Sequence, residues 1–209
     1  LSNDYGDYTQ IANSVYLNLT ARPRSGLVLQ GGFNTGKTGT DYCGVRSSIP
    51  EWTVLGAQSP TNPWCDTSAG WVTRATGLGT YTIPKVDVLV AGTFRSEQGI
   101  SLAANWAAPN SATVGLNRPF AGVAGTTVTV NLIEPGTLFG DRINQFDMRF
   151  AKILRFGRTR ANVGVDLYNV GNTAPVLGYN QTFVPNGAWL APTSVLQPRF
   201  VKFSAQIDF

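Results

Sequence analysis

Histidine is absent from this chain of 209 residues, and cysteine occurs only twice. Without histidine, neither a Ser-His-Asp nor a Cys-His catalytic arrangement can form, and no histidine-based metal site is possible. Charged residues make up 13%, well below the roughly one quarter that is usual in soluble globular domains. No apolar run approaches the roughly 18 residues that a membrane-spanning helix requires. We therefore expect no enzyme, no cofactor, no metal site and no helical membrane span.

The basic excess of the chain is small and dispersed along the sequence. Lysine and arginine number 16 against 12 acidic residues, and no cluster of them suggests a nucleic-acid partner. Low charge without long apolar runs is typical of a transmembrane β-barrel, because lipid-facing and lumen-facing residues alternate along each of its strands.

Seven segments alternate apolar and polar residues with a period of two, which predicts β-strands with one apolar and one polar face. The last is the most regular, because Val201, Phe203, Ala205, Ile207 and Phe209 all fall on one face. Tight turns are expected after the first, third and fifth strands, and long segments after the second, fourth and sixth. The predicted strands are 13–22, 26–36, 85–95, 99–107, 142–155, 159–169 and 199–209.

This alternation of connections predicts an all-β, antiparallel, up-and-down transmembrane β-barrel with short periplasmic turns and long extracellular loops. The long segments, 37–84, 108–141 and 170–198, exceed the connections of a compact soluble domain. Complete single-chain bacterial barrels have an even number of strands, whereas seven are predicted here. We therefore expect residues 1–209 to be the C-terminal part of one larger barrel, with a missing neighbour beside each outermost strand.

Several strand motifs resemble those of outer-membrane proteins. The apolar alternation that ends at Phe209 is similar to the C-terminal signal that bacterial barrels present to the barrel-assembly machinery. The Oar-like branch of the TonB-dependent receptors, whose members carry an N-terminal carboxypeptidase-regulatory-like domain, is the nearest likeness. The segments that resemble the last strands of these receptors are DRINQFDMRFAK (141–152), GVDLYNVGN (164–172), LQPRFVKF (196–203) and YTIP (81–84).

The resemblance implies a barrel of about 22 strands around an N-terminal plug. Such a receptor lies in outer-membrane lipid and imports a substrate with energy from the inner-membrane TonB complex. The plug, the TonB box and roughly fifteen strands are expected outside this sequence. The substrate stays open among peptides, glycans, siderophores and cobalamin. Two other interpretations remain: a passive porin or structural barrel, and a soluble secreted β-sandwich for adhesion or carbohydrate binding.

Cys43 and Cys65 lie in a segment rich in Gly, Pro, Ser and Thr. Zinc would need more ligands than these two residues supply, so we predict a disulfide formed in an oxidising compartment. It should lie on an extracellular loop.

Aromatic residues in the long segments either line a ligand vestibule or pack the loops together. A second group near strand ends, Phe94, Trp106, Phe146, Phe156 and Phe209, is expected in the aromatic girdles at the membrane interfaces. The vestibule candidates are Trp52, Trp64, Trp71, Tyr81, Tyr179 and Trp189.

A turn at 157–158 determines the register of the fifth and sixth predicted strands. Phe150 is then expected opposite Val165 on the lipid side. Arg149 meets Asp166 on the lumen side, in an ion pair that we interpret as scaffold because a hydrated pair contributes only ~0–1 kcal/mol.

Residues 31–38 read GGFNTGKT, a literal match to the phosphate-binding P-loop pattern. That mechanism requires a helix beginning at the lysine, here Lys37, whose N-terminal amides hold the phosphates. The following residues favour no helix and no βαβ alternation occurs, so we interpret the match as the end of a glycine-rich strand.

Overall fold

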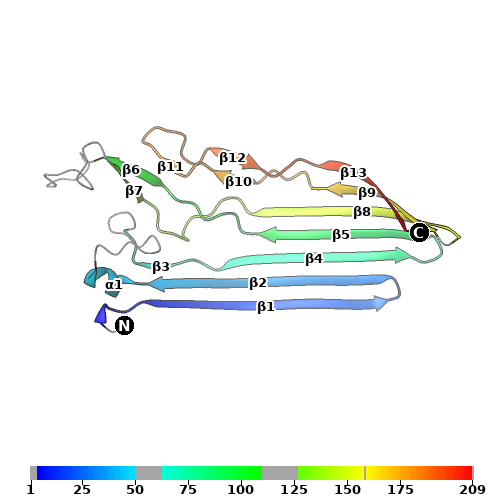
Figure 1. Ribbon diagram of the computed structural model, residues 1–209, viewed down its shortest axis with the longest axis horizontal. Helices are drawn as coiled ribbons and strands as arrows, with labels where there is room; N and C mark the ends of the chain where they lie inside the picture. Colours follow the sequence, from blue (N-terminus) through cyan, green and yellow to red (C-terminus); the bar gives the residue numbers. More distant parts are fainter. Residues whose placement is uncertain (1–3, 50–62, 110–126, 158, 209) are drawn as a thin grey trace.

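A computed structural model describes residues 4–49, 63–109, 127–157 and 159–208 and shows an all-β chain (Figure 1). Seven long strands form one antiparallel sheet with the order β1-β2-β4-β5-β8-β9-β13. Their order in the sheet is therefore the same as their order along the chain. The strands are β1 Thr9–Arg24, β2 Leu27–Asp41, β4 Val72–Ile83, β5 Val88–Glu97, β8 Ile143–Phe156, β9 Thr159–Tyr168 and β13 Phe200–Asp208.

Short turns and long connections alternate around this sheet, as predicted. The turns at 25–26, at 84–87 and at Gly157 lie at one end, which we call the tight-turn end, together with the C-terminal end of β13 (Figure 1). Gly26 and Gly157 supply positive φ angles of 77° and 60° in two of these turns. The chain leaves and re-enters the sheet at the opposite, long-connection end.

The predicted strand at 99–107 is wrong, and β4, which the sequence did not reveal, is the missing member of the seven. On its apolar face β4 carries Ala75, Gly77 and Gly79, and such small residues produce almost no hydrophobic alternation. Leu102 belongs instead to the start of a long connection, where it is buried and its amide N–H donates to the carbonyl oxygen of Leu138 at 2.9 Å. A residue buried on all sides by loops can mimic one buried on a single face of a strand.

The predicted tight turn at 96–98 is also wrong, because β5 ends there and pairs with β8 rather than with the segment that follows. The short turn of this region is 84–87, between β4 and β5. It contains two residues with positive φ, Lys85 (70°) and Asp87 (50°). The misplaced turn follows from the missed strand: without β4 in front of β5, the short turn was predicted after β5 instead of before it.

Smaller elements gather at the long-connection end (Figure 1). The parallel pairing of β6 with β11 departs from the antiparallel pattern. No helix in the described ranges is long and apolar enough to cross a membrane. The small elements are α1 Cys43–Ser48, β3 Asp66–Ser68 beside β2, the sheet of β6 Asn105–Pro109, β7 Thr127–Asn131 and β11 Thr182–Phe183, and the pair β10 Val176–Tyr179 with β12 Pro192–Val195.

The two cysteines form the predicted disulfide. Cys43, at the start of α1, is bonded to Cys65, just before β3, with 4.9 Å between the Cα atoms. Beside the bond, the Tyr42 amide donates to the Cys65 carbonyl oxygen at 3.0 Å and the Tyr42 hydroxyl donates to the Trp64 carbonyl oxygen at 2.7 Å. The disulfide thus closes a loop at the long-connection end.

Most apolar residues of the seven strands lie on one face of the sheet, because the register brings like faces together; a few, such as Leu78 and Leu89, lie on the opposite face. Much of this face is exposed, with Phe203 at 78% and Leu17 at 65% of their accessible areas. Among the described residues, the buried apolar side chains belong to the long connections, apart from Ala151 on the opposite face. One row of directly paired residues crosses the whole sheet: Ala21, Leu29, Gly79, Gly92, Met148, Leu167 and Val201.

The predicted register of the turn at 157–158 is confirmed, since Phe150 lies opposite Val165 and Arg149 opposite Asp166. Within the described residues the sheet is open. β1 pairs only with β2, and β13 pairs only with β9. Each outermost strand therefore lacks a second neighbour, as the odd strand count led us to expect.

The structure predicts that the disulfide stabilises its own loop rather than the sheet. In the double variant Cys43→Ser/Cys65→Ser, we expect tryptic cleavage after Arg46, inside the closed loop, to accelerate about 10- to 100-fold, because a bridge over ~20 residues restricts the open chain by about 3 kcal/mol. Cleavage after Lys85, in a turn at the other end, is the internal control and should not change. Equal rates after Arg46 in both proteins, or free thiols in unreduced protein, would contradict this.

Candidate functional site

The face opposite the apolar one carries the polar side chains of the strands, and it is the candidate functional surface. Towards the long-connection end an ordered set of charges joins neighbouring strands. Glu97 of β5 accepts from Arg74 of β4 and from Arg95 of its own strand, each at 3.2 Å. Arg95 also donates to the Gln145 side-chain oxygen at 2.9 Å, and Gln145 donates to the Asp147 carboxylate at 3.0 Å.

Arg149 and Asp166 form the predicted ion pair near the middle of the same face, with 3.0 Å between Arg149 Nη1 and Asp166 Oδ1. The Arg149 side chain is 36% exposed, whereas that of Asp166 is 9% exposed. The Ser204 hydroxyl of β13 adds a longer contact to Asp166 at 3.4 Å. Both charged groups line a depression of about 260 Å³ that also includes Tyr168. The pair therefore sits in an open polar hollow and ties β8 to β9.

The three arginines and three carboxylates of this network balance in charge, and each of these carboxylates has a donor in contact. Such an arrangement holds strands in register and offers hydrogen-bonding groups to a polar partner. Within the described ranges, no three Cys, Asp or Glu residues gather as a metal ion would require. The balanced set consists of Arg74, Arg95 and Arg149 with Glu97, Asp147 and Asp166.

Asn169, which the sequence analysis did not single out, is the most completely bonded residue at the long-connection end. It is 2% exposed, and its side chain donates to the carbonyl oxygens of Thr173 and Gln197, both at 2.8 Å. Its side-chain oxygen accepts from the Thr173 amide at 3.0 Å, and its own amide donates to Asp147 at 2.7 Å. Asn169 therefore fastens the connection after β9 to the polar face. The available sequence signal was an asparagine two residues before Gly171, because asparagine adopts positive φ more readily than most residues. The φ of Asn169 is 49°.

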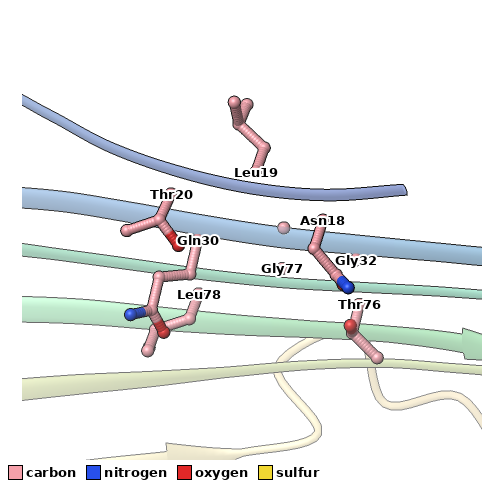
Figure 2. A pocket seen from close by; sticks show the side chains of 9 residues that line it. Asn18, Leu19, Thr20, Gln30, Gly32, Thr76, Gly77 and Leu78 are labelled. Atoms are coloured by element: carbon pink, nitrogen blue, oxygen red, sulfur yellow. The ribbon is translucent and has the colours of Figure 1, made fainter. Parts of the chain in front are cut away.

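A neutral groove occupies the other half of the polar face, over β1, β2 and β4 (Figure 2). Its volume is about 390 Å³, and it continues into a second depression of about 250 Å³ that shares Asn18, Gly32 and Thr76. Gly32 leaves the floor open, since a Cβ atom there would lie 3.0 Å from Thr76 Oγ1 and 3.2 Å from Asn18 Oδ1. Thr20 and Gln30 point to the same side, whereas Leu19 points to the apolar face (Figure 2). Amide and hydroxyl groups in this arrangement suit neutral polar groups.

The P-loop match lies in this region and forms no phosphate site of that type. Lys37 belongs to the extended strand β2, so no helix begins at the lysine. A short helix does follow, contrary to expectation, but α1 starts only at Cys43 and has six residues. The glycines at positions 31 and 32 lie in β2, where they pair with residues of β4.

Of the vestibule candidates, Tyr179 and Trp189 pack loops together. The Tyr179 hydroxyl accepts from the Asp141 amide at 3.1 Å. The Trp189 indole donates to the Ala103 carbonyl oxygen at 3.1 Å, and its ring meets Phe183 edge-on at 5.7 Å. These contacts fasten the connection after β9 to the connection after β5, so the packing alternative describes both residues.

The other candidates are scattered. Trp64 is half-buried beside the disulfide. Trp71, just before β4, is 52% exposed, and Lys37 Nζ lies 5.9 Å from its ring centre. Tyr81 was assigned wrongly, because it lies in β4 near the tight-turn end, under the Arg24 guanidinium at 4.4 Å. Trp52 is outside the described residues. The structure does not bring these aromatic residues together into one vestibule.

The expected girdle aromatics divide as well. Phe94 and Phe146 lie directly opposite each other on the apolar face, near the long-connection end. Phe156 is exposed at the other end of β8. Trp106 was misplaced, because it belongs to β6 outside the large sheet. Phe209 lies outside the described residues.

The proposed assembly signal forms a regular stripe on β13. Val201, Phe203, Ala205 and Ile207 lie on the apolar face, and all are exposed at the edge of the sheet. Their assembly role stays a prediction, as does that of Phe209.

Comparison with protein-family models, with curated proteins and with solved structures finds no match to this chain. The function must therefore be inferred from the two faces of the sheet, its open edges and its two ends.

The structure predicts that Asn169 contributes far more stability than its neighbour Asn172, although their φ angles of 49° and 50° are almost identical. Asn169→Ala should lower the free energy of unfolding by about 2–4 kcal/mol, because several buried groups lose their partners. Asn172→Ala is the matched control and should cost about 1 kcal/mol or less, since within the described residues its side chain has one hydrogen bond, accepted from the Arg199 amide at 3.0 Å. Urea titrations in the same detergent measure both, and similar losses would contradict the assigned role.

Proposed function

We propose that this chain is the C-terminal part of the transmembrane barrel of a TonB-dependent outer-membrane receptor. The observation that carries the proposal is a single-layered sheet whose entire apolar face is uncovered in the described residues. A partner for that face must be as apolar and as extensive as the face itself. Lipid acyl chains meet both requirements.

The size of the apolar face argues against exposure to water. Seven strands about 4.8 Å apart, each with about eight residues of 3.3 Å in the band, give roughly 700–800 Å² of surface. The largest apolar patch on a typical soluble monomer covers only about 300–600 Å². In a β-sandwich a second sheet would pack about 10 Å away, whereas the described long strands contact chiefly their neighbours in the sheet and leave this face exposed. The lipid-facing interpretation is therefore favoured over the soluble sandwich.

Polar groups border the apolar band at the long-connection end, as expected where a surface leaves the core of a bilayer. At the long-connection end, the hydroxyls of Thr35 and Thr73 pair across β2 and β4 at 2.9 Å. Ser96 donates to Asn144 at 2.7 Å across β5 and β8. In β4 the apolar band runs from position 75, beyond this polar border, to position 83 at the end of the strand. These 9 residues match the ~9–11 residues of a tilted membrane strand.

The register supports a barrel wall rather than a flat sheet. At the first tight turn β2 begins with Leu27, opposite Tyr81, yet β4 continues to Ile83. Val88 begins β5 opposite Lys152, yet β8 continues to Phe156. Successive hairpins thus extend further in one direction, and closed barrels require such a stagger because their strands tilt. The open edges at β1 and β13 are where further strands would pair.

The resemblance of the strand motifs is the basis for proposing active import, a plug and the TonB complex. On this reading the polar face lines the lumen, and its groove and charged network face the plug or the substrate path. A passive porin is the alternative, since its wall would present the same two faces.

Spectroscopic labels test which face meets lipid. The chain contains no free cysteine, so Leu17→Cys and Asn18→Cys each introduce a single reactive thiol on adjacent residues of β1. With a polarity-sensitive fluorophore attached, we expect the label at position 17, but not at 18, to emit as in an apolar medium and to be quenched by lipid-borne quenchers. The full-length protein in vesicles is the sample. Equal quenching at both positions would refute a lipid-facing wall.

Conductance separates a plugged receptor from a porin. In a planar bilayer with KCl, the full-length protein should conduct little and should open reversibly in urea, because the plug unfolds before the barrel. It should also bind the isolated C-terminal domain of TonB. High conductance without urea, together with no TonB binding, would favour the porin and reject the receptor.

A further inference from the structure

Cations that are far apart in the sequence gather at the tight-turn end. They come from all three tight hairpins, and the only acidic residues at this end are Asp87 and Asp208 in the part of the chain that the structure describes. Six cations against these two acidic residues give the described part of this end a net charge of +4, as large as the formal charge of the whole chain. We call the group the basic rim: Arg22, Arg24, Lys85, Lys152, Arg155 and Arg160.

The rim is organised around the β4–β5 turn. From β8, Lys152 donates to the Val86 carbonyl oxygen, and Arg155 pairs with Asp87 at 3.4 Å. The turn is further held by the Ile153 amide, which donates to the Asp87 carbonyl oxygen at 2.9 Å. These contacts give the cations defined positions at the end of the sheet.

Two of the cations are on the apolar face. Arg24 lies opposite Leu27, and its guanidinium covers Tyr81; Lys152 shares the face of Phe150 and Val88. Lys85, exposed in the turn, lies between them in the order of the strands. Among the described residues, none of the three has a carboxylate within 4.0 Å, because Asp87 pairs with Arg155.

Long cationic side chains at the border of an apolar band extend towards the charged layer next to it. In a bilayer that layer contains lipid phosphates, and a surplus of positive charge favours headgroups that are anionic overall. The long-connection end differs, because it contains many acidic residues as well: Asp4, Asp7, Asp41, Asp66, Glu97, Glu134 and Asp141.

We propose that Arg24, Lys85 and Lys152 bind the phosphates of anionic phospholipids in the membrane leaflet at the tight-turn end. This inference rests on the proposed function, since it needs the apolar face to lie in lipid. Arg155 and Arg160 lie on the polar face, where Arg160 is opposite Asp208, so they belong to the lumen side of the rim. The two sides of the rim therefore provide a built-in comparison.

The selectivity of the protein for anionic over zwitterionic lipid tests the proposal. The full-length protein is placed in phosphatidylcholine vesicles containing spin-labelled phosphatidylglycerol or spin-labelled phosphatidylcholine, and the motionally restricted fraction of each is recorded at low salt. The unmodified protein should prefer phosphatidylglycerol. Lys85→Gln/Lys152→Gln should lower that preference about threefold or more. Arg160→Gln removes one positive charge from the lumen side without releasing Asp87, and it should leave the preference nearly unchanged. Lys85→Gln alone, at an exposed turn, should show a smaller loss if the double variant folds poorly.

The outcomes that would overturn the proposal are distinct. An equal loss in the single variants Lys85→Gln and Arg160→Gln would assign the preference to the overall charge rather than to the outer side of the rim. No preference in the unmodified protein would remove the site, and abolition of the preference by millimolar inorganic phosphate would assign it to free phosphate. The absence of any restricted lipid, charged or neutral, would contradict the proposed function itself.

Discussion

The structure depends on one constraint: the apolar side chains of seven strands must stay on the same face. Side chains alternate along a strand, so a slip of one residue in any pairing would move that strand's apolar set to the polar face. The row from Ala21 to Val201 shows the constraint satisfied across the whole sheet. In a lipid-facing wall, a slip in β8 would turn Arg149 into the hydrocarbon, at about 2–4 kcal/mol near the midplane. The apolar face therefore determines the register, and the register determines what the polar face can contain.

The polar face follows from that register. Arg149 meets Asp166, and Arg74 and Arg95 meet Glu97, because the strands bring these positions together while their apolar neighbours align on the other side. Each exposed pair contributes little, at ~0–1 kcal/mol. As a set they penalise the wrong pairings of strands. Asn169 extends this order to the loops by joining Asp147 to the connection that leads to β13. Sheet, polar network and loop packing are thus one arrangement.

The accuracy of the sequence-based expectations depended on the strength of the local pattern. β8 and β9 were predicted closely, with their turn and their register, because bulky apolar residues alternate with charged ones on both sides of a glycine turn. β4 was missed, because glycine and alanine carry its apolar face. Leu102 was assigned to a strand because burial by loops produces the same local spacing as burial by a sheet. The disulfide was predictable because only two cysteines exist.

By itself the sequence determined the all-β class, the apolar and polar faces of most strands, the alternation of short and long connections, and the Cys43–Cys65 bond. Each of these depends on residue type and on spacing within a few positions. Only the tertiary structure decided which strands are neighbours, and therefore which distant residues share a site. Arg24, Lys85 and Lys152 look dispersed in the sequence, yet three hairpins bring them to one end of the sheet. Tyr81 was predicted in a long connection, but the pairing of β4 with β5 places it in the sheet near the tight-turn end. Pairing between strands is long-range, and no local pattern encodes it.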